Sequence, residues 1–367
     1  MRLRIDCAYD GTDFHGWAKQ PGLRTVQGEM ESALGRIFRE GDPDRRPAMT
    51  SDEALPGAGA GAGADAGGSE AGSCRMQSSA EAASCESGMA EHGDAAGGGP
   101  SQEWRGVSRL TVAGRTDTGV HAAHQVCHLD IDPDTLSTCV GHMDSSAPVA
   151  LARRLNHLLP GDIAIHSVSV APDGFDARFS ALDRIYVYRI KDGLCQRDPR
   201  LRNCVASIEG ILDLDVMNAV SAYMRGLHDF GSFSTPNPGG TTIRDVKSAE
   251  WIRVEENVTG NPHADRGGSP DFSDAGDDVA FGSGMVCFRI VADAFAHNMV
   301  RSLVNACVKV GLHRKSAEWF MGKIDVPLRE GSTGPISACG LTLEHVEYPP
   351  DDQLAERARS IRARRTL

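Results

Sequence analysis

The feature that most constrains this chain is a long stretch without the residues that build a hydrophobic core. Residues 42 to about 105 are dominated by Gly, Ala, Ser and acidic residues, with almost no large apolar side chains. Such a composition cannot bury enough apolar surface to offset the entropy lost on ordering. We therefore expect a disordered insertion here, and a second acidic, Gly-rich insertion at about 255–284. The folded body must be assembled from the flanking segments, which is feasible because the cost of closing a loop grows slowly with its length.

These two insertions also explain the net charge of the chain, which is −12. They carry so many acidic residues that the remainder has a net charge near +1. A nearly neutral body can still present a basic groove, so the acidic total does not exclude a nucleic-acid partner.

The cysteines and the amino terminus indicate where the protein works. The ten cysteines are scattered, with no Cys-x-x-Cys pair and no histidine cluster, so we expect reduced thiols and no metal site. The first six residues carry charges where a signal peptide needs an apolar block, and no apolar run approaches the length of a membrane span. We therefore predict a cytoplasmic protein without membrane contact.

The patterned segments predict two rounds of strands and helices. Alternation of apolar and polar residues indicates strands near 3–7, 109–113, 124–131, 163–171, 184–190, 241–254, 285–290 and 340–349. Helical spacing indicates helices at 25–38, with Thr25 as N-cap, and at 148–159, 213–225 and 295–311. The segments 109–113 and 124–131 are expected to pair, as are the two strands flanking the second insertion. This alternation predicts an α+β fold.

The segment between the second and third of these strands carries the main candidate for chemistry. Asp117 lies between Gly114 and Gly119, which permit unusual turns and close approach to a ligand, so its carboxylate can be presented into a cleft. Arg115 projects from the same side of an extended segment and can keep that carboxylate ionised or bind a phosphate. The alternative is an Asp-Thr turn that only caps a loop.

Two further stretches carry candidates for binding RNA. Arg184, Tyr186 and Tyr188 share one face of a strand, which suits phosphate binding and base stacking, although an ordinary half-buried strand has the same pattern. Arg301 lies in the first turns of a helix, where the helix dipole does not favour a cation, so it is expected to face a carboxylate or a phosphate. The alternative is a partly exposed arginine on a helix flank.

Taken together and in order, these stretches resemble the bacterial tRNA pseudouridine synthase A family. The matching pieces are Tyr9-Asp10-Gly11-Thr12 with Gly16-Trp17 and Thr25-Val26-Gln27; Gly114 to Ala122; Ala177-Arg178-Phe179-Ser180-Ala181 with Arg184, Tyr186 and Tyr188; His228-Asp229-Phe230 with Ser232-Phe233; Met299-Val300-Arg301; and Gly340-Leu341. They cover nearly the whole chain outside the insertions, and six ordered matches are far more specific than any one motif. The chain departs from the family pattern at Ala18, Lys19, Asp293, Ala296 and Asn305, and in a slightly longer segment from Thr333 to Gly340.

The resemblance implies a fold of two similar halves, residues 1–175 and 176–350, whose mostly antiparallel sheets join around a central cleft, with helices outside and a basic tail at 351–367. It implies isomerisation of uridine to pseudouridine at positions 38, 39 and 40 of the tRNA anticodon arm, by a homodimer that needs neither cofactor nor metal. By the same resemblance the site residues divide by role: Asp117 is the nucleophile, Arg115 and Arg301 are its charged neighbours, Tyr186 packs against the base, Leu341 lines the uracil pocket, and Arg184 and Arg178 bind substrate.

Two other functions stay open at this level. A protein that binds or folds tRNA could keep the cleft without the chemistry, although the presence of Asp117, Arg115, Tyr186 and Arg301 disfavours this. An aspartate-dependent glycosidase is weaker still, because no second carboxylate is clearly placed to act as the acid.

Overall fold

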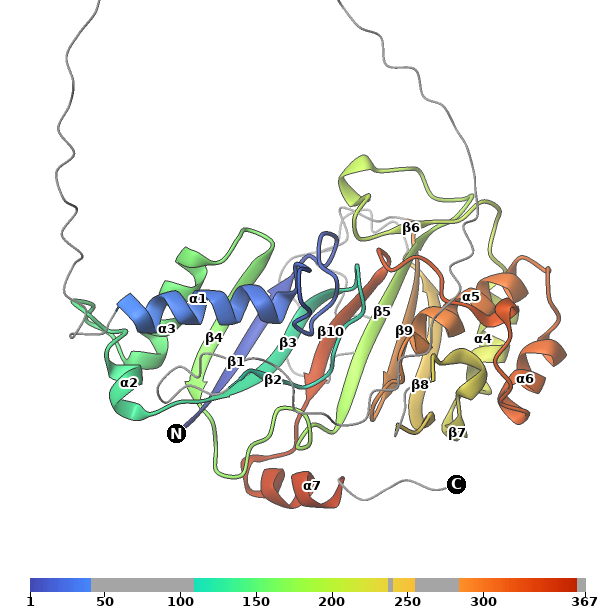
Figure 1. Cartoon of the computed structure of the whole chain (residues 1–367). Coiled ribbons are helices and arrows are strands. Elements are labelled where there is room, and N and C mark those ends of the chain that lie inside the picture. The colour runs from blue at the N-terminus through green and yellow to red at the C-terminus, as the bar shows by residue number, and fades with distance from the viewer. Residues whose placement is uncertain (41–108, 237–239, 255–283, 362–367) are drawn as a thin grey trace, which may run out of the picture. The chain divides into compact units, whose positions relative to one another are not determined.

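A computed structural model of the chain describes residues 1–40, 109–236, 240–254 and 284–361 (Figure 1). Within these residues ten strands form one sheet, whose main path runs β4-β1-β3-β10-β5-β9-β8-β7. The α+β class expected from the sequence is confirmed. The insertion predicted at 42–105 lies outside the described residues, as do residues 255–283 of the second insertion and residues 362–367 of the basic tail.

The amino-terminal half contributes one edge of the sheet. Its elements are β1 (Arg2–Tyr9), α1 (Val26–Glu40), β2 (Thr111–Val112), β3 (His121–Asp130), α2 (Pro133–Ser137), α3 (Ala147–Leu158) and β4 (Ile163–Val170). β1 lies antiparallel between β3 and β4. β2 pairs antiparallel with β3, as predicted, and both strands follow the long insertion in the sequence. Thr25 caps α1, since its Oγ1 accepts a hydrogen bond from the Gly28 N–H at 3.2 Å.

The carboxyl-terminal half continues the same sheet. Its elements are β5 (Asp183–Lys191), β6 (Ala206–Ser207), α4 (Leu214–Ala222), β7 (Gly226–Asp229), β8 (Ile243–Arg253), β9 (Val286–Ala292), α5 (Met299–Gly311), α6 (Ala317–Asp325), β10 (Leu341–Glu347) and α7 (Leu354–Ser360). Short 3₁₀ turns occupy Pro199–Leu201, Gly231–Phe233, Gly331–Thr333 and Asp351–Gln353. The predicted hairpin around the second insertion is confirmed, because β8 and β9 pair antiparallel. The boundary at residue 175 falls between β4 and β5 and stays a prediction.

The two halves meet at β10, the last strand in sequence but a central one in space (Figure 1). β10 runs parallel to β3, with Thr342 opposite His121, and antiparallel to β5, with Leu343 opposite Tyr186. This arrangement places the start of β3, directly after the segment that carries Asp117, next to β10, which carries Leu341, and one strand away from β5, which carries Tyr186. The family motifs therefore converge at the middle of the sheet.

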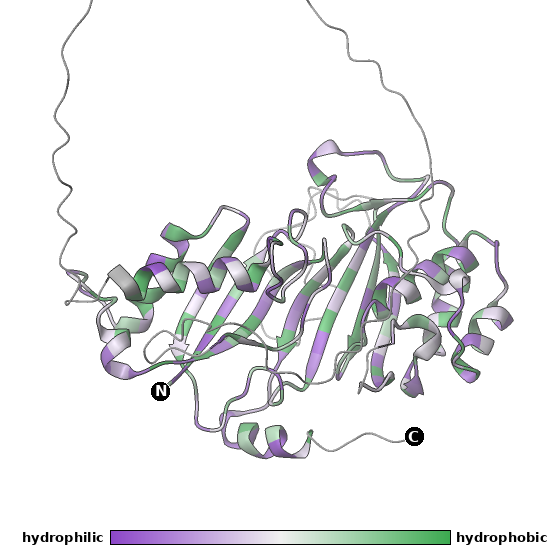
Figure 2. Cartoon of the chain, in the orientation of Figure 1, coloured by the Kyte–Doolittle hydropathy of each residue, from purple (hydrophilic) through white to green (hydrophobic). Residues whose placement is uncertain are grey.

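Apolar side chains from the strands and the long helices form the core. Leu3 and Ile5 of β1 and Val26 and Met30 of α1 are fully buried. α3 packs on β4, and α4 packs on β8 and α5. The central strands alternate between hydrophobic and hydrophilic residues in Figure 2, as strands with one face in the core do. The sheet is thus a rigid base from whose strand ends the functional loops extend.

Candidate active site

Asp117 lies on the connection between β2 and β3, and hydrogen bonds fix this connection on both sides of it. The carbonyl of Thr116 accepts the backbone N–H of Trp17 at 3.1 Å, and its hydroxyl bonds the Tyr9 hydroxyl at 2.8 Å. On the other side, the N–H of Gly119 donates to the Phe14 carbonyl at 3.1 Å. Gly119 adopts a φ of +77°, which side chains disfavour. The motif expected to present an aspartate is therefore held in one conformation by β1 and the residues after it.

His121 ties the same connection to β10. The Gly11 N–H donates to Nδ1 of His121 at 3.0 Å, so the neutral ring carries its hydrogen on Nε2, which bonds the Cys339 carbonyl at 3.1 Å. Gly11 has no room for a side chain, because a Cβ there would lie 2.0 Å from the Val120 carbonyl oxygen. The residues just before Leu341 are thus anchored to the segment that follows Asp117.

The carboxylate of Asp117 faces the loop that leads into α5. Its Oδ1 lies 3.5 Å from Nε2 of His297, and the backbone N–H of Asn298 also bonds the carboxylate. Burial raises the pKa of Asp117 above its ordinary value, although His297, Arg301 and the Asn298 N–H each lower it. The net direction is upward because desolvation of the charged form outweighs these three contributions.

Arg301 is near Asp117 but is engaged elsewhere. Its Nε donates to the Ile336 carbonyl at 2.7 Å, and its Nη1 donates to Oδ1 of Asn298 at 3.3 Å. Among the described residues no direct ion pair joins Arg301 to Asp117. The charge of Arg301 lowers the pKa of Asp117, but less than His297 does, and the effect of burial is larger than either.

The loop before α5 differs from its predicted conformation. The expected helix at 295–311 begins only at Met299, because Asn298 takes the left-handed conformation with φ 62°. The amide of Asn298 donates to Thr235 Oγ1 at 2.9 Å, and the Thr235 N–H donates to the His297 carbonyl at 2.9 Å. This turn directs His297 and the Asn298 N–H at Asp117.

Tyr186 lies buried near the carboxylate, and Leu341 is buried at the start of the neighbouring strand β10. The Tyr186 ring is 6% exposed and packs edge to face on Phe295, with centroids 5.1 Å apart. Burial, together with the negative charge of Asp117, raises the pKa of Tyr186. Leu341 is 4% exposed and lies opposite Tyr188 in the sheet. The Tyr188 hydroxyl donates to the Ser337 carbonyl at 2.8 Å, which fixes the entry to β10.

The other arginines expected to bind substrate occupy different environments. Arg184 is 7% exposed, and its guanidinium donates to the carbonyls of Asp293, Ala113 and Arg178 at 2.7, 2.7 and 2.8 Å. Burial lowers its pKa. Arg184 thus joins the segment before Asp117 to the segment before His297. Arg178 and Arg115 are exposed, and the Arg178 guanidinium lies 5.2 Å from the centroid of the Phe179 ring.

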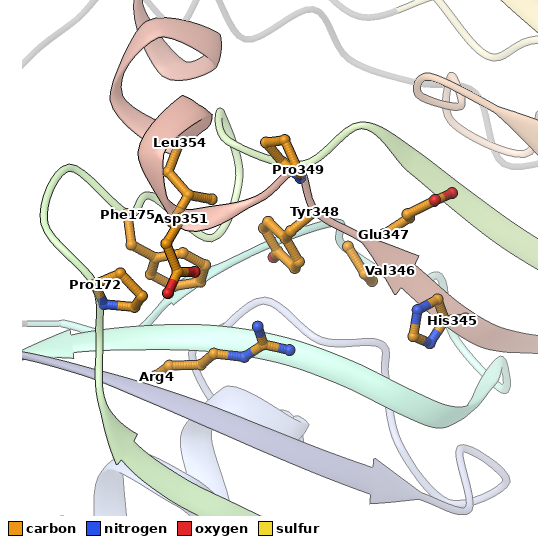
Figure 3. A pocket seen from close by; sticks show the side chains of 10 residues that line it. All are labelled: Arg4, Pro172, Phe175, His345, Val346, Glu347, Tyr348, Pro349, Asp351 and Leu354. Carbon is orange, nitrogen blue, oxygen red and sulfur yellow. The ribbon is translucent and has the colours of Figure 1, made fainter.

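Sequence reasoning did not single out His297, Asn298 or Phe295. The signal that could have identified them is their position directly before Met299-Val300-Arg301, but that segment has helical spacing and was assigned to the helix. A hollow of about 260 Å³ lies elsewhere in the described part, where Arg4 faces the rings of Phe175 and Tyr348 (Figure 3). Arg4 is already bonded to Asp6 there, at 2.8 Å.

Neither a candidate metal centre nor a membrane-spanning helix is found among the described residues. No group of three or more His, Cys, Asp or Glu side chains there is arranged to hold a metal ion. No helix in the same part of the chain combines the length and apolar character needed to span a bilayer.

Comparison with known proteins gives a consistent result. Residues 220–349 match the family model described as tRNA pseudouridine synthase. Curated proteins named tRNA pseudouridine synthase A align over the whole chain. That of Bifidobacterium longum strain DJO10A is 50% identical, covering 100% of this chain and 99% of the relative. That of Bifidobacterium animalis subsp. lactis is 49% identical with the same coverage, and that of Cutibacterium acnes is 35% identical, covering 100% and 95%.

Proposed function

Because this chain belongs to the tRNA pseudouridine synthase A family, we propose that Asp117 is the residue with which it attacks its substrate. The family reaction isomerises a uridine of tRNA to pseudouridine, and this chain is an enzyme of that class. The alternative of a tRNA-binding protein without chemistry is not supported. The observation that carries the role of Asp117 is its carboxylate, partly buried on a fixed segment beside His297, Arg301 and Tyr186.

The reaction requires few catalytic groups besides such a carboxylate. The N1 glycosidic bond of uridine breaks, the uracil turns, and a bond forms between C5 and C1′, so no group enters or leaves overall. An ionised Asp117 can start this sequence as a nucleophile at C1′ or C6, or by assisting a route through a glycal. A carboxylate whose pKa burial has raised is more basic, which favours each route.

The remaining site residues have complementary roles in the proposal. Tyr186 packs against the flipped base and Leu341 lines the uracil pocket; the burial of Tyr186 near Asp117 and of Leu341 on the strand next to β5 supports these roles. The exposed Arg115 and Arg178 bind phosphates of the RNA. Arg301 and Arg184 act from within, because each bonds backbone carbonyls of the loops that form the site. For Arg184 this replaces the phosphate contact expected from the sequence.

The proposal extends to the form in which the enzyme acts. The target is the anticodon arm, at positions 38 to 40, and the active form is a homodimer in the cytoplasm that uses no metal or cofactor. The resemblance of the ordered motifs supports these points. Light scattering of the purified protein should give about twice the chain mass of 39.1 kDa. A fully active monomer would contradict the dimer.

The role of Asp117 is tested by Asp117→Asn, which keeps the shape of the side chain and removes its charge. We expect tritium release from tRNA labelled at uracil C5 to be abolished, with tRNA binding largely kept. Mass-neutral pseudouridine in an anticodon stem-loop, detected as a carbodiimide adduct, should disappear in parallel. Turnover equal to that of the wild type would refute the assignment.

A further inference from the structure

The contact between His297 and Asp117 joins a half-exposed imidazole to a largely buried carboxylate. The His297 side chain is 52% exposed and that of Asp117 27%, and Nε2 lies 3.5 Å from Oδ1. The backbone of His297 is fixed by the bond from the Thr235 N–H to its carbonyl. The imidazole therefore contacts both the carboxylate and the solvent.

The reaction requires one proton to leave the site and another to arrive. Uridine carries a hydrogen on C5 that pseudouridine lacks, and pseudouridine carries one on N1. After the C5–C1′ bond has formed, the C5–H pair becomes the C5=C6 bond and the C6=N1 pair moves to N1, which takes a proton from water. The proton from C5 needs an acceptor, and a free Asp117 carboxylate is the group at hand. Asp117 must then lose this proton before the next turnover.

The groups that face Asp117 differ in their ability to accept that proton. Arg301 stays charged and is engaged with Ile336 and Asn298. Tyr186 is buried, with a raised pKa, and starts as a neutral phenol. Arg115 lies on the same segment as Asp117, is exposed and also stays charged. His297 is the neighbour that carries an imidazole, the side chain that most often acts as a general acid or base in enzymes.

The neighbours of Nε2 offer a hydrogen-bond partner to both the neutral and the protonated ring. The amide Nδ2 of Asn298 lies 3.4 Å from Nε2, so a neutral ring can accept there while its Nδ1 carries the hydrogen. When protonated, the same Nε2 can donate to Oδ1 of Asp117. One small ring movement thus exchanges an amide partner for the carboxylate.

From this geometry we infer that His297 is the proton-transfer partner of Asp117. The inference rests on the proposed function: the proton that Asp117 takes from C5 passes to Nε2 of His297, and the proton on Nδ1 passes to water, which restores the Asp117 carboxylate. Proton exchange of the ring with water then moves its hydrogen from Nε2 back to Nδ1 before the next turnover. His297 acts through Asp117 and need not contact the uracil. It therefore affects turnover rather than substrate affinity.

The test compares His297→Ala and His297→Gln with the wild type in turnover of C5-tritiated tRNA across pH. We expect kcat to fall about 10²-fold with KM unchanged, a size typical of lost acid–base assistance. Because the side chain is half exposed, free imidazole should reach the gap in His297→Ala and restore the rate in proportion to its neutral form. The kcat of the wild type should depend on pH in the range where imidazoles titrate, and this dependence should be absent in both variants.

His313→Gln is the matched control, because His313 is also exposed and pairs with an aspartate, Asp213, at 3.3 Å. It should leave the rate and the pH profile unchanged. Rates within about 3-fold of the wild type in both His297 variants, with the same pH profile, would overturn the inference. So would a loss that imidazole does not restore and that accompanies a lower melting temperature. If Asp117→Asn is inactive while His297→Ala turns over at the wild-type rate, only the proton-transfer role of His297 is refuted. If Asp117→Asn is active, the proposed role of Asp117 is refuted, and the inference about His297 with it.

Discussion

Replacing Arg184 with methionine should both destabilise the protein and disorganise its active site. The guanidinium donates three hydrogen bonds of 2.7 to 2.8 Å to carbonyls in three separate segments. Methionine has a similar length and no donor, so all three carbonyls lose this partner. Two of the segments continue into Asp117 and His297, and their separation therefore depends on one buried side chain.

The size of the effect follows from the number of bonds. Each buried acceptor left without a donor costs about 1–3 kcal/mol, and two of the three bonds are buried, which gives at least about 2 kcal/mol. Part of this is offset because methionine removes a buried cation whose pKa burial has lowered. We expect a net loss of about 2–4 kcal/mol, or on the order of 5–10 °C in melting temperature. A displacement of about 1 Å between the two loops would cost about 10²-fold in kcat.

Urea unfolding and single-turnover kinetics measure the two effects separately. The stability and kcat of Arg184→Lys should lie between those of the wild type and Arg184→Met, because one ammonium group cannot bond all three carbonyls that the planar guanidinium bonds. Arg153→Met is the control for stability, since Arg153 is exposed on α3 and its loss should change the free energy of unfolding by less than about 0.5 kcal/mol. If Arg184→Met unfolds at the urea midpoint of the wild type, the reasoning is refuted.

Three further substitutions test other parts of the structure. Burial would raise the pKa of Asp6, but hydrogen bonds from His124, Arg4 and Ser167 outweigh it and hold the pKa below the ordinary value. Asp6→Asn should therefore lower the free energy of unfolding by about 1–3 kcal/mol at neutral pH. A loss of stability in urea unfolding that does not shrink below about pH 4 would contradict this. Asp117 has a raised pKa, so its stability contribution is present at low pH and lost as pH rises through the folded pKa; Asp117→Asn should melt no lower than the wild type at pH 8, with the difference vanishing toward acid pH. Gly340→Ala should cost about 1–3 kcal/mol, because the new Cβ would lie 2.7 Å from both the Arg189 carbonyl and the Tyr188 ring, whereas Gly322→Ala, in a helix with open space around it, should be neutral or stabilising in the same melts.

Local patterns were sufficient for most elements of the fold. Alternation located β1, β3 and β5, and apolar spacing located α1, α3 and α5, because both signals are periodic within one segment. The pairing of β2 with β3 was also predictable, since the two strands flank a tight Gly-rich turn. The position of β10 between β3 and β5 was not, because no local feature of a strand specifies its neighbours.

The site shows the same limit at the level of single side chains. Period-two spacing correctly placed Arg184 and Tyr186 on one face of β5, but it cannot say that Arg184 meets three carbonyls while Tyr186 meets Phe295. The helical pattern before Met299 hid the left-handed residue Asn298, and with it the contact of His297 with Asp117. What a residue contacts across the fold depends on tertiary geometry that periodicity does not encode.

The nitrogen-bearing side chains around Asp117 bond mainly to backbone carbonyls, and this bears on the reactivity of the carboxylate. Three of them donate hydrogen bonds to backbone carbonyls: Arg184 to that of Asp293, Arg301 to that of Ile336, and the ring of His121 to that of Cys339. These bonds hold the loops around the aspartate without pairing directly with its carboxylate. A direct arginine pair would lower the pKa of Asp117 and make it a weaker nucleophile and a weaker base. Holding the loops through their carbonyls instead leaves the carboxylate basic in a site that is already organised, which is the combination that a uridine isomerase needs.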